Sequence, residues 1–326
     1  MKIVFFGTPF FAAENLQCLL NNGEEIVAVV TPPDSKKGRG KILKSCAVKE
    51  TALENNLLVL QPEKLRSNDF INNLNHLNAE LFIVVAFRML PEAVWKIPKK
   101  GTINLHASLL PNYRGAAPIN WTLINGEKET GISTFFINER IDSGAILVQK
   151  KVKLTENTTA AQLHNILINK GNDILIESLY NIKNNNINPI IQEEIENTTK
   201  APKLTKELLK INWKKSANDI HNLVRGLSPF LDNSTTLKDI SICPSAWFML
   251  ECHNGKQKRI KVHLTKIVKS ESNNILQIKS DNKNYLHIST NKDIVSIIML
   301  QVEGKKPITI QQFLQGNKIT AEHKII

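Results

Sequence analysis

The chain has 326 residues, of which 42% are hydrophobic and 22% charged, and its 42 Lys and Arg against 30 Asp and Glu give a formal net charge of +12. This length is enough for two domains with large cores. The apolar run at the start is too short for a signal peptide, and no stretch is apolar enough to span a membrane, so we expect a cytoplasmic protein. The four cysteines show no Cys-x-x-Cys pairing and no histidines at zinc spacing, so a metal is not implied.

The positive charge is concentrated in the last part of the chain. Residues 1–199 carry a net charge of +1, whereas residues 200–326 carry +11. Such an asymmetry is typical of proteins that bind a polyanion, because neutralising phosphates releases condensed counterions. A general Lys- and Asn-rich composition is the alternative explanation, but it would not leave the first 199 residues almost neutral.

The first half of the chain alternates apolar strands with helices. We predict strands at 2–6, 25–31, 57–60, 81–86, 102–106 and 131–137, and helices at 10–21, 46–55, 69–77 and 118–125, with a basic loop at 31–49. Alternation of this kind, with Val- and Ile-rich strands, predicts a mostly parallel sheet covered on both faces. In such sheets ligands bind beyond the carboxyl ends of the strands.

The pattern changes after a long amphipathic helix predicted at 158–183. The following segment is polar and punctuated by prolines, so we predict a linker at 190–205 between a catalytic domain at 1–189 and a second domain at 206–326. In the second domain a helix at 216–227 precedes short alternating strands at 246–251, 259–268, 276–280 and 294–302. These short strands predict a small β-barrel.

Three polar side chains indicate acyl-transfer chemistry. Asn104 and His106 lie two positions apart at the end of a predicted strand, so their side chains share one face. Asp142 follows another predicted strand, in a tight turn that we expect to face the same pocket. An amide, an imidazole and a carboxylate together suit acyl transfer. The alternative is structural: a hydrogen-bonded core pair, and an Asp that caps its turn.

These residues belong to a longer pattern that resembles the folate-dependent formyltransferase family. In that family Asn-x-His, Ser-Leu-Leu-Pro and a later Asp-x-Gly build the site, as at 104–106, 108–111 and 142–144 here. The match extends to both ends of the chain, through Gly-Thr-Pro at 7–9, Gly-Arg-Gly-Lys at 38–41, Val-Ala-Phe-Arg-Met-Leu-Pro at 85–91, Gly-Ala-Ala-Pro at 115–118, Ala-Pro-Lys-Leu-Thr at 201–205 and Arg-Gly-Leu-Ser-Pro at 225–229. The resemblance implies an α/β fold: a Rossmann-like, mostly parallel sheet, followed by a smaller OB-like β-barrel.

The resemblance also implies a reaction. The formyl group of 10-formyltetrahydrofolate would pass to the α-amine of methionine esterified to initiator tRNA, giving N-formylmethionyl-tRNA for translation initiation. Asn104 would hold the developing oxyanion and His106 would relay a proton. Asp142 would orient or charge-stabilise the imidazolium, or contact the pterin. The amine substrate itself attacks, and no Gly-x-Ser-x-Gly sequence surrounds Ser108, so we do not expect a serine nucleophile.

Two further groups of residues are implied to bind the substrates. The folate slot would comprise Phe87, Arg88, Met89, Leu90, Ser108, Leu109, Leu110 and Pro111. Core packing is the alternative role for Phe87, Met89 and Leu90. The basic loop would meet the tRNA acceptor stem through Lys36, Lys37, Arg39 and Lys41, with Arg39 the principal contact, and the alternative is a merely solvated loop. We expect a monomer that needs no metal and no membrane.

Other functions stay open at this point. One is formyl transfer to a small amine, such as glycinamide ribonucleotide or an amino sugar nucleotide, but those relatives generally lack the basic loop and the carboxyl-terminal barrel. Another is a non-catalytic RNA-binding protein on a decayed scaffold, against which the joint presence of Asn104, His106 and Asp142 argues. The chain also departs from the family by an insertion at 231–242, whose polar composition predicts an exposed loop.

Overall fold

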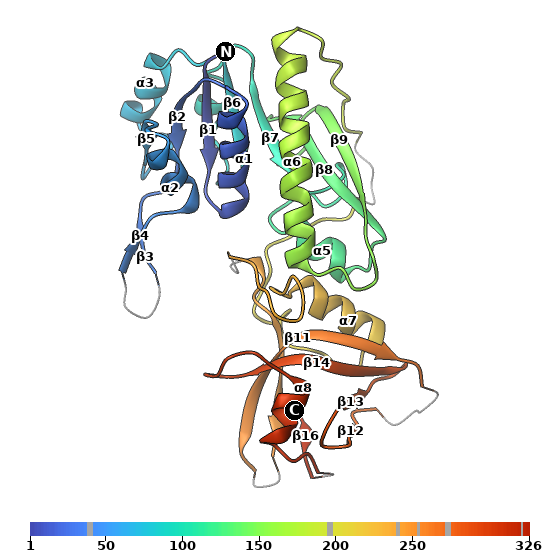
Figure 1. Cartoon of the computed structure of the whole chain (residues 1–326). Coiled ribbons are helices and arrows are strands. Elements are labelled where there is room, and N and C mark those ends of the chain that lie inside the picture. Colours follow the sequence, from blue (N-terminus) through green and yellow to red (C-terminus); the bar gives the residue numbers. More distant parts are fainter. Residues whose placement is uncertain (38–41, 194–197, 239–241, 253–254, 271–274, 321) are drawn as a thin grey trace. The chain divides into compact units, whose positions relative to one another are not determined.

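The computed structural model describes all residues except 38–41, 194–197, 239–241, 253–254, 271–274 and 321. The described residues form two compact units (Figure 1). Unit 1 consists of Met1–Gly115, Thr130–Val152 and His164–Lys200, and unit 2 of Ala116–Glu129, Lys153–Leu163 and Ala201–Ile326. The units are therefore interleaved along the chain. The contiguous domains expected at 1–189 and 206–326 stay a prediction.

Unit 1 is built on a seven-stranded sheet with the order β5-β2-β1-β6-β7-β8-β9. The strands are β1 (Ile3–Gly7), β2 (Ile26–Val30), β5 (Val59–Leu60), β6 (Leu81–Val85), β7 (Thr102–His106), β8 (Glu129–Phe136) and β9 (Ile146–Lys153). Neighbours from β5 to β7 pair in parallel, whereas β7 and β8 pair antiparallel. The predicted mostly parallel sheet is confirmed. Strands β1 and β6 are buried along their whole length, as their continuous apolar sequences require.

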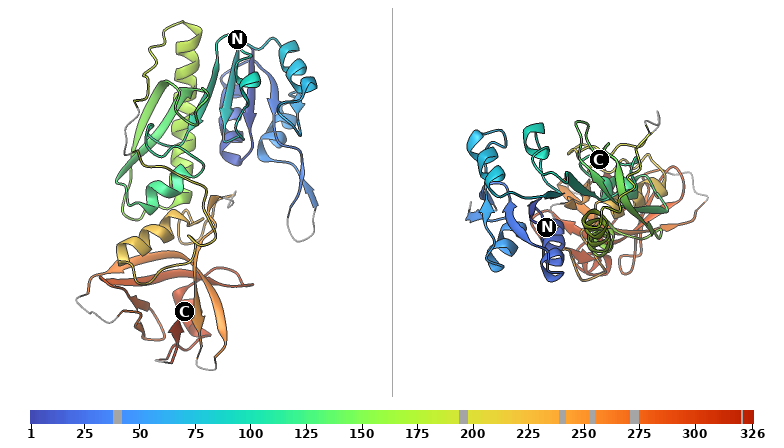
Figure 2. Two further views of the ribbon diagram at one scale, coloured as in Figure 1. Left: turned by 180° about the vertical axis from the view of Figure 1, so that it is seen from behind. Right: turned by 90° about the horizontal axis from the view of Figure 1, so that it is seen from above.

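Helices cover both faces of this sheet (Figures 1 and 2). On one face lie α1 (Phe10–Asn21), α2 (Ala47–Glu54) and α6 (Ala160–Lys183), and on the other α3 (Asn68–His76) and α4 (Glu92–Trp95). A Cβ on Gly171 of α6 would lie 3.0 Å from Leu105 of β7, so the helix approaches the sheet closely there. On the opposite face, Phe70 of α3 and Val94 of α4 are buried together with alternate residues of β1 and β6.

The predicted basic loop at 31–49 contains a small hairpin instead. Its strands are β3 (Ser35–Lys37) and β4 (Ile42–Lys44), which pair antiparallel, and Figure 1 shows the hairpin standing away from the sheet of unit 1. The sequence signal was weak because charged residues outnumber apolar ones in this stretch. At the base, the Asp34 carboxylate accepts hydrogen bonds from Lys49 Nζ at 2.7 Å and Gln61 Nε2 at 3.0 Å. The bond from Lys49, followed by that from Gln61, lowers the pKa of Asp34.

Unit 2 contains a second, antiparallel sheet with the order β12-β13-β14-β11-β10-β16, and β15 pairs with β14. The strands are β10 (Ala246–Glu251), β11 (Gln257–Val268), β12 (Ile278–Ser280), β13 (Leu286–Ser289), β14 (Ile294–Val302), β15 (Ile308–Thr309) and β16 (Lys324–Ile325). The helices of this unit are α5 (Pro118–Ile124), α7 (Ala217–Gly226) and α8 (Ile310–Gln315). Ser216 and Asp219 form a capping box that starts α7. The predicted OB-like barrel is confirmed.

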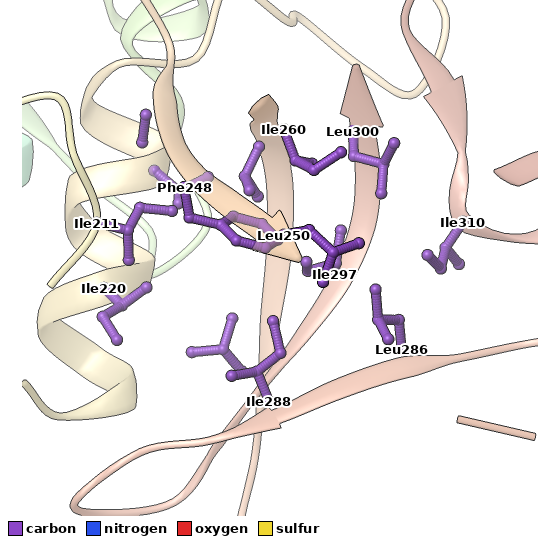
Figure 3. Close-up of a cluster of buried hydrophobic side chains, with 14 of the residues drawn as sticks. Ile211, Ile220, Phe248, Leu250, Ile260, Leu286, Ile288, Ile297, Leu300 and Ile310 are labelled. Atoms are coloured by element: carbon purple, nitrogen blue, oxygen red, sulfur yellow. The ribbon is translucent and has the colours of Figure 1, made fainter. Parts of the chain in front are cut away.

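Alternation along the strands places one apolar face inside this barrel. Ala246, Phe248 and Leu250 of β10 are buried, while the residues between them are partly exposed. Figure 3 shows Phe248 and Leu250 among isoleucines and leucines from β11, β13 and β14. The ring of Trp213 meets Phe248 edge to face at 5.3 Å. Strands β10, β11, β13 and β14 each contribute two or three buried side chains to this core.

The insertion at 231–242 is an exposed turn over most of its described part. Asp232 through Thr236 are exposed, whereas Leu237 is buried. The Asp232 carboxylate accepts the N–H groups of Ser234 and Thr235, both at 2.7 Å. These bonds, those from Ser234 first, lower the pKa of Asp232 to about 2. No helix among the described residues is long and apolar enough to cross a membrane.

Candidate active site

The candidate site lies at the carboxyl end of β7, the last strand of the parallel run. Asn104 and His106 project from the same face of this strand, on the side where Val84, the register partner of Asn104, joins the core with α3 and α4. The buried Leu105 between them faces α6. The sequence therefore predicted correctly that the amide and the imidazole share one face.

His106 is held by the main chain on one side and faces a carboxylate on the other. Its Nε2 lies 2.9 Å from the Tyr113 carbonyl oxygen, which can only accept a hydrogen bond, so Nε2 carries the proton. Its Nδ1 lies 3.7 Å from Oδ2 of Asp142. The neutral ring thus presents its unprotonated nitrogen, Nδ1, toward the carboxylate of Asp142.

Asp142 is fixed in the turn predicted from the sequence. Its φ of 51° is left-handed, a conformation that Asp tolerates better than most residues. The Gly115 N–H donates to Oδ2 at 2.9 Å, so the oxygen that faces His106 is also anchored to the main chain. The turn needs Gly144, because a Cβ there would lie 1.6 Å from the Phe136 carbonyl oxygen. The structure therefore brings together the imidazole and the carboxylate.

Asn104 differs from His106 and Asp142 in having no side-chain hydrogen bond or ion pair within the described part of the chain. Its side chain is partly exposed and makes no hydrogen bond to any other residue that the structure describes. An amide on the last strand of the parallel run, free of internal bonds, is available to a bound molecule. It offers two N–H donors on the face of β7 from which His106 also projects.

The loop at 108–111, which follows β7, is tied to β8 and β9 by hydrogen bonds. Ser108 is fully buried, and its hydroxyl donates to the Asn112 carbonyl at 2.7 Å, which agrees with its not being a nucleophile. Ser133 of β8 donates to the Ser108 carbonyl at 2.6 Å, and Gln149 of β9 donates to the Leu110 carbonyl at 2.9 Å. The Leu110–Pro111 peptide is cis. Leu110 packs in a buried cluster, whereas Leu109 and Pro111 are partly exposed. Sequence reasoning singled out neither Ser133 nor Gln149.

The second predicted wall, at 87–90, divides into core and exposed residues. Phe87 meets Phe6 edge to face at 5.7 Å and Leu90 is buried, whereas 72% of Met89 is exposed. Arg88 donates to the Glu63 carbonyl at 3.1 Å and also to the Pro62 carbonyl. Within the described part of the chain, the main-chain groups of Phe87, Arg88 and Met89 form no hydrogen bonds. Unpaired peptide groups beside an exposed thioether suit a flat ring edged with donors and acceptors, such as a pterin.

Two of the four predicted tRNA-binding residues lie on the first strand of the hairpin. Lys36 and Lys37 belong to β3. Arg39 and Lys41 lie outside the described residues. Their role as tRNA contacts stays a prediction.

Unit 2 holds a cavity of about 200 Å³ that is unrelated to these residues. Its lining includes His221, Arg225, Phe230 and His263. Two of its polar side chains are already occupied by internal hydrogen bonds. His221 bonds to Thr265 Oγ1 at 2.9 Å, and Arg225 donates to the Thr158 carbonyl at 3.2 Å. We therefore do not place the reaction in this cavity.

His263 in the cavity wall gives unit 2 a stability that depends on pH. Burial lowers the pKa of His263 from 6.5 to about 4, against an opposing contribution from Gln301, and nearby Lys261 lowers the pKa further. Between pH 4 and pH 6.5, His263 is protonated in the unfolded chain but neutral in the folded chain. The free energy of unfolding should therefore fall by up to ~3 kcal/mol as the pH drops from 6.5 to 4.

Urea midpoints measured across this pH range check the prediction. In His263→Gln the midpoint should depend less steeply on pH. Part of the slope should remain, because burial also lowers the pKa of His221. An unchanged slope in His263→Gln would show that this histidine is not the group responsible.

Sequence comparisons match the chain over both units. Residues 1–179 match a family described as formyl transferase, and residues 203–318 match the formyl transferase C-terminal domain. A methionyl-tRNA formyltransferase from Flavobacterium johnsoniae is 41% identical over 325 residues, covering 100% of this chain and 99% of that protein. A second, from Clostridium perfringens strain SM101, is 45% identical over 323 residues and covers 98% of both chains.

Solved structures share the fold at lower identity. The sugar 3N-formyl transferase WlaRD, whose structure was determined with dTDP and 5-N-formyl-THF, aligns over 94% of this chain and 99% of its own, with a TM-score of 0.62 and 23% identity. HypX from Aquifex aeolicus, in complex with tetrahydrofolic acid, aligns over 96% of this chain and 47% of its own, with a TM-score of 0.59 and 17% identity. From the family matches and the full-length relatives, the chain belongs to the folate-dependent formyltransferase family, among the methionyl-tRNA formyltransferases.

Proposed function

We propose that this chain transfers the formyl group of 10-formyltetrahydrofolate to the α-amine of methionine esterified to initiator tRNA, yielding N-formylmethionyl-tRNA for translation initiation. The observation that carries the proposal is the site at the end of β7, where the His106–Asp142 pair accompanies the free amide of Asn104. It occurs in a chain 41% and 45% identical to methionyl-tRNA formyltransferases over nearly its whole length.

Asn104 is the proposed oxyanion donor. When the amine attacks the formyl carbon, negative charge develops on the formyl oxygen. The side-chain amide of Asn104 has no hydrogen bond to another described residue to give up, so it can donate to that oxygen without reorganisation. A donor of this kind contributes about 10²–10³-fold in rate.

His106 is the proposed proton relay. Its Nδ1 removes a proton from the attacking amine and returns it to N10 of the folate as the bond between N10 and the formyl carbon breaks. Throughout the reaction Nε2 keeps its own proton, which it donates in a hydrogen bond to the Tyr113 carbonyl oxygen. The Asp142 carboxylate, 3.7 Å from Nδ1, stabilises the transient imidazolium. No formyl group is carried by the protein in this scheme.

We assign the folate slot to the two loops beside β7. The exposed Met89 and the unpaired main-chain groups of Phe87–Met89 would contact the pterin, with Leu90 as the buried support. The loop Ser108–Pro111, which Ser133 and Gln149 brace, would form the other wall. The folate supplies the activated formyl group, and these residues orient it toward Asn104.

We assign tRNA binding to the basic parts of the chain. Residues 200–326 carry a net charge of +11, which favours contact with phosphates. The hairpin residues Lys36 and Lys37, together with Arg39 and Lys41, would meet the acceptor stem, and a guanidinium at Arg39 can make bidentate contacts that a lysine cannot. We further propose that the enzyme works as a monomer in the cytoplasm. Sedimentation of the purified chain, alone and with tRNA, tests the oligomeric state.

A comparison of acceptors tests the proposed reaction. The purified chain is incubated with 10-formyltetrahydrofolate and either initiator methionyl-tRNA, glycinamide ribonucleotide or an amino sugar nucleotide, and the formylated product is quantified. Methionyl-tRNA should be formylated with the highest kcat/KM. Faster formylation of either small amine would assign the chain to a different reaction within the same family.

A further inference from the structure

We propose that Gln192 is a positioning residue for formyl transfer, which holds the Asp142 turn and Arg114 together around His106. The inference rests on the proposed function, because its readout is the formylation of methionyl-tRNA. Gln192 lies in the segment after α6 that the sequence predicted to be a linker. Its side chain is nevertheless 8% exposed, whereas 81% of the preceding Ile191 is exposed.

The side-chain amide of Gln192 is fully used in hydrogen bonds. Its Oε1 accepts from Arg114, from Nε at 3.2 Å and from Nη2 at 2.7 Å. Its Nε2 donates to the carbonyl oxygens of Asp142 at 3.1 Å and Gly144 at 2.7 Å. Two acceptor positions and two donor protons are all that an amide side chain offers. No shorter or purely accepting side chain reproduces this set.

The position of Gln192 is set by main-chain pairing. Ile190 and Ile146 exchange two hydrogen bonds, each 2.8 Å, in an antiparallel bridge at the start of β9. Two residues further along, this register brings Gln192 opposite Gly144. The bridge at the start of β9 therefore fixes the side-chain amide of Gln192 next to the Asp142 turn.

Gln192 joins the two loops that hold the imidazole and the carboxylate. Arg114 lies between Tyr113, whose carbonyl accepts from His106, and Gly115, whose N–H donates to Asp142. On the other side, Gln192 ties down two carbonyls of the turn that places Asp142 in its left-handed conformation. Loss of the amide releases both loops at once. A shift of about 1 Å between reacting groups costs up to ~10²-fold in rate, even when its cause lies outside the contacts with substrate.

Single variants of the full-length chain test this role. In Gln192→Ala, kcat for methionyl-tRNA formylation should fall about 10–100-fold, while KM for 10-formyltetrahydrofolate changes by less than about threefold. Gln192→Glu keeps an acceptor for Arg114 but loses the donors to Asp142 and Gly144. It should lose kcat as well and, with the Arg114 contact kept, it provides a folded variant if Gln192→Ala is unstable.

The matched control is Gln17, a half-buried glutamine of α1 in the same unit whose amide bonds only to Asn21 and Asn55 among the described residues. Gln17→Ala and Gln17→Glu should formylate at the wild-type rate. Wild-type kcat in folded Gln192→Glu, or equal losses at positions 17 and 192, would overturn the proposal.

A double-mutant cycle separates positioning from a general structural effect. Adding Gln192→Ala to Asp142→Asn should lower kcat by less than Gln192→Ala does in the wild type, because one of the groups that Gln192 positions is already lost. Multiplication of the two single effects would refute the proposal. The rate of the wild-type chain separates the two proposals. If the wild type does not formylate methionyl-tRNA, the proposed function is wrong. If the wild type is active but the effects of the two substitutions multiply, only the role of Gln192 is wrong.

Discussion

Replacement of His106 by alanine should lower kcat for formyl transfer about 10²–10⁴-fold while the chain stays folded. The variant loses Nδ1, the nitrogen that faces Asp142 at 3.7 Å, and with it the proposed proton relay. Steady-state formylation of initiator methionyl-tRNA measures the loss, and circular dichroism verifies the fold. His106→Gln should be equally slow, because its amide can still donate to the Tyr113 carbonyl but cannot exchange protons near neutral pH.

The control for the two His106 variants is a substitution of His76. This exposed histidine of α3 lies in the same unit and bonds to the Asn72 carbonyl at 2.7 Å. His76→Ala should retain the wild-type rate. Near-normal turnover in purified His106→Ala or His106→Gln would contradict the proton relay, since in both variants the relaying nitrogen is gone.

Replacement of Asn104 by alanine should lower kcat about 10²–10³-fold, because the developing oxyanion loses its donor. KM for both substrates should change little, since the amide acts mainly in the transition state. Asn104→Asp provides a matched variant of the same size, in which a negative oxygen replaces the donor. It should be at least as slow as Asn104→Ala. A rate in Asn104→Asp close to that of the wild type would show that the residue fills space and does not stabilise charge.

Strands with a clear apolar pattern were predictable from the sequence. The predictions at 102–106, 246–251 and 294–302 coincide with β7, β10 and β14, and the helix at 10–21 coincides with α1. The hairpin at 35–44 was missed because lysines hide its alternation. Strand β9 was missed because Gln149, Lys150 and Lys151 interrupt its apolar residues. These two elements obtain their structure from pairing with a neighbour, which local sequence does not reveal.

The same distinction applies to the site. The spacing of Asn104 and His106 fixes their common face, and the turn after the neighbouring strand places Asp142 at 3.7 Å from His106. A shared catalytic role of the three residues stays a prediction. Gln192 lies 50 residues beyond Asp142, in a segment whose polar composition resembles a linker. Its contribution depends on the bridge between Ile190 and Ile146, a long-range register that one sequence does not specify.

A single-turnover experiment tests whether the formyl group passes directly from folate to methionyl-tRNA at this site. The wild-type chain in excess is mixed with initiator methionyl-tRNA and 10-formyltetrahydrofolate labelled in the formyl group, and samples are quenched rapidly. Label is then measured in the folate, the protein and the tRNA. We expect the label to leave the folate and appear on the methionyl amine at the same rate, with none on the protein. Label that accumulates on a protein side chain before it reaches the tRNA, or that never reaches the tRNA, would contradict direct transfer.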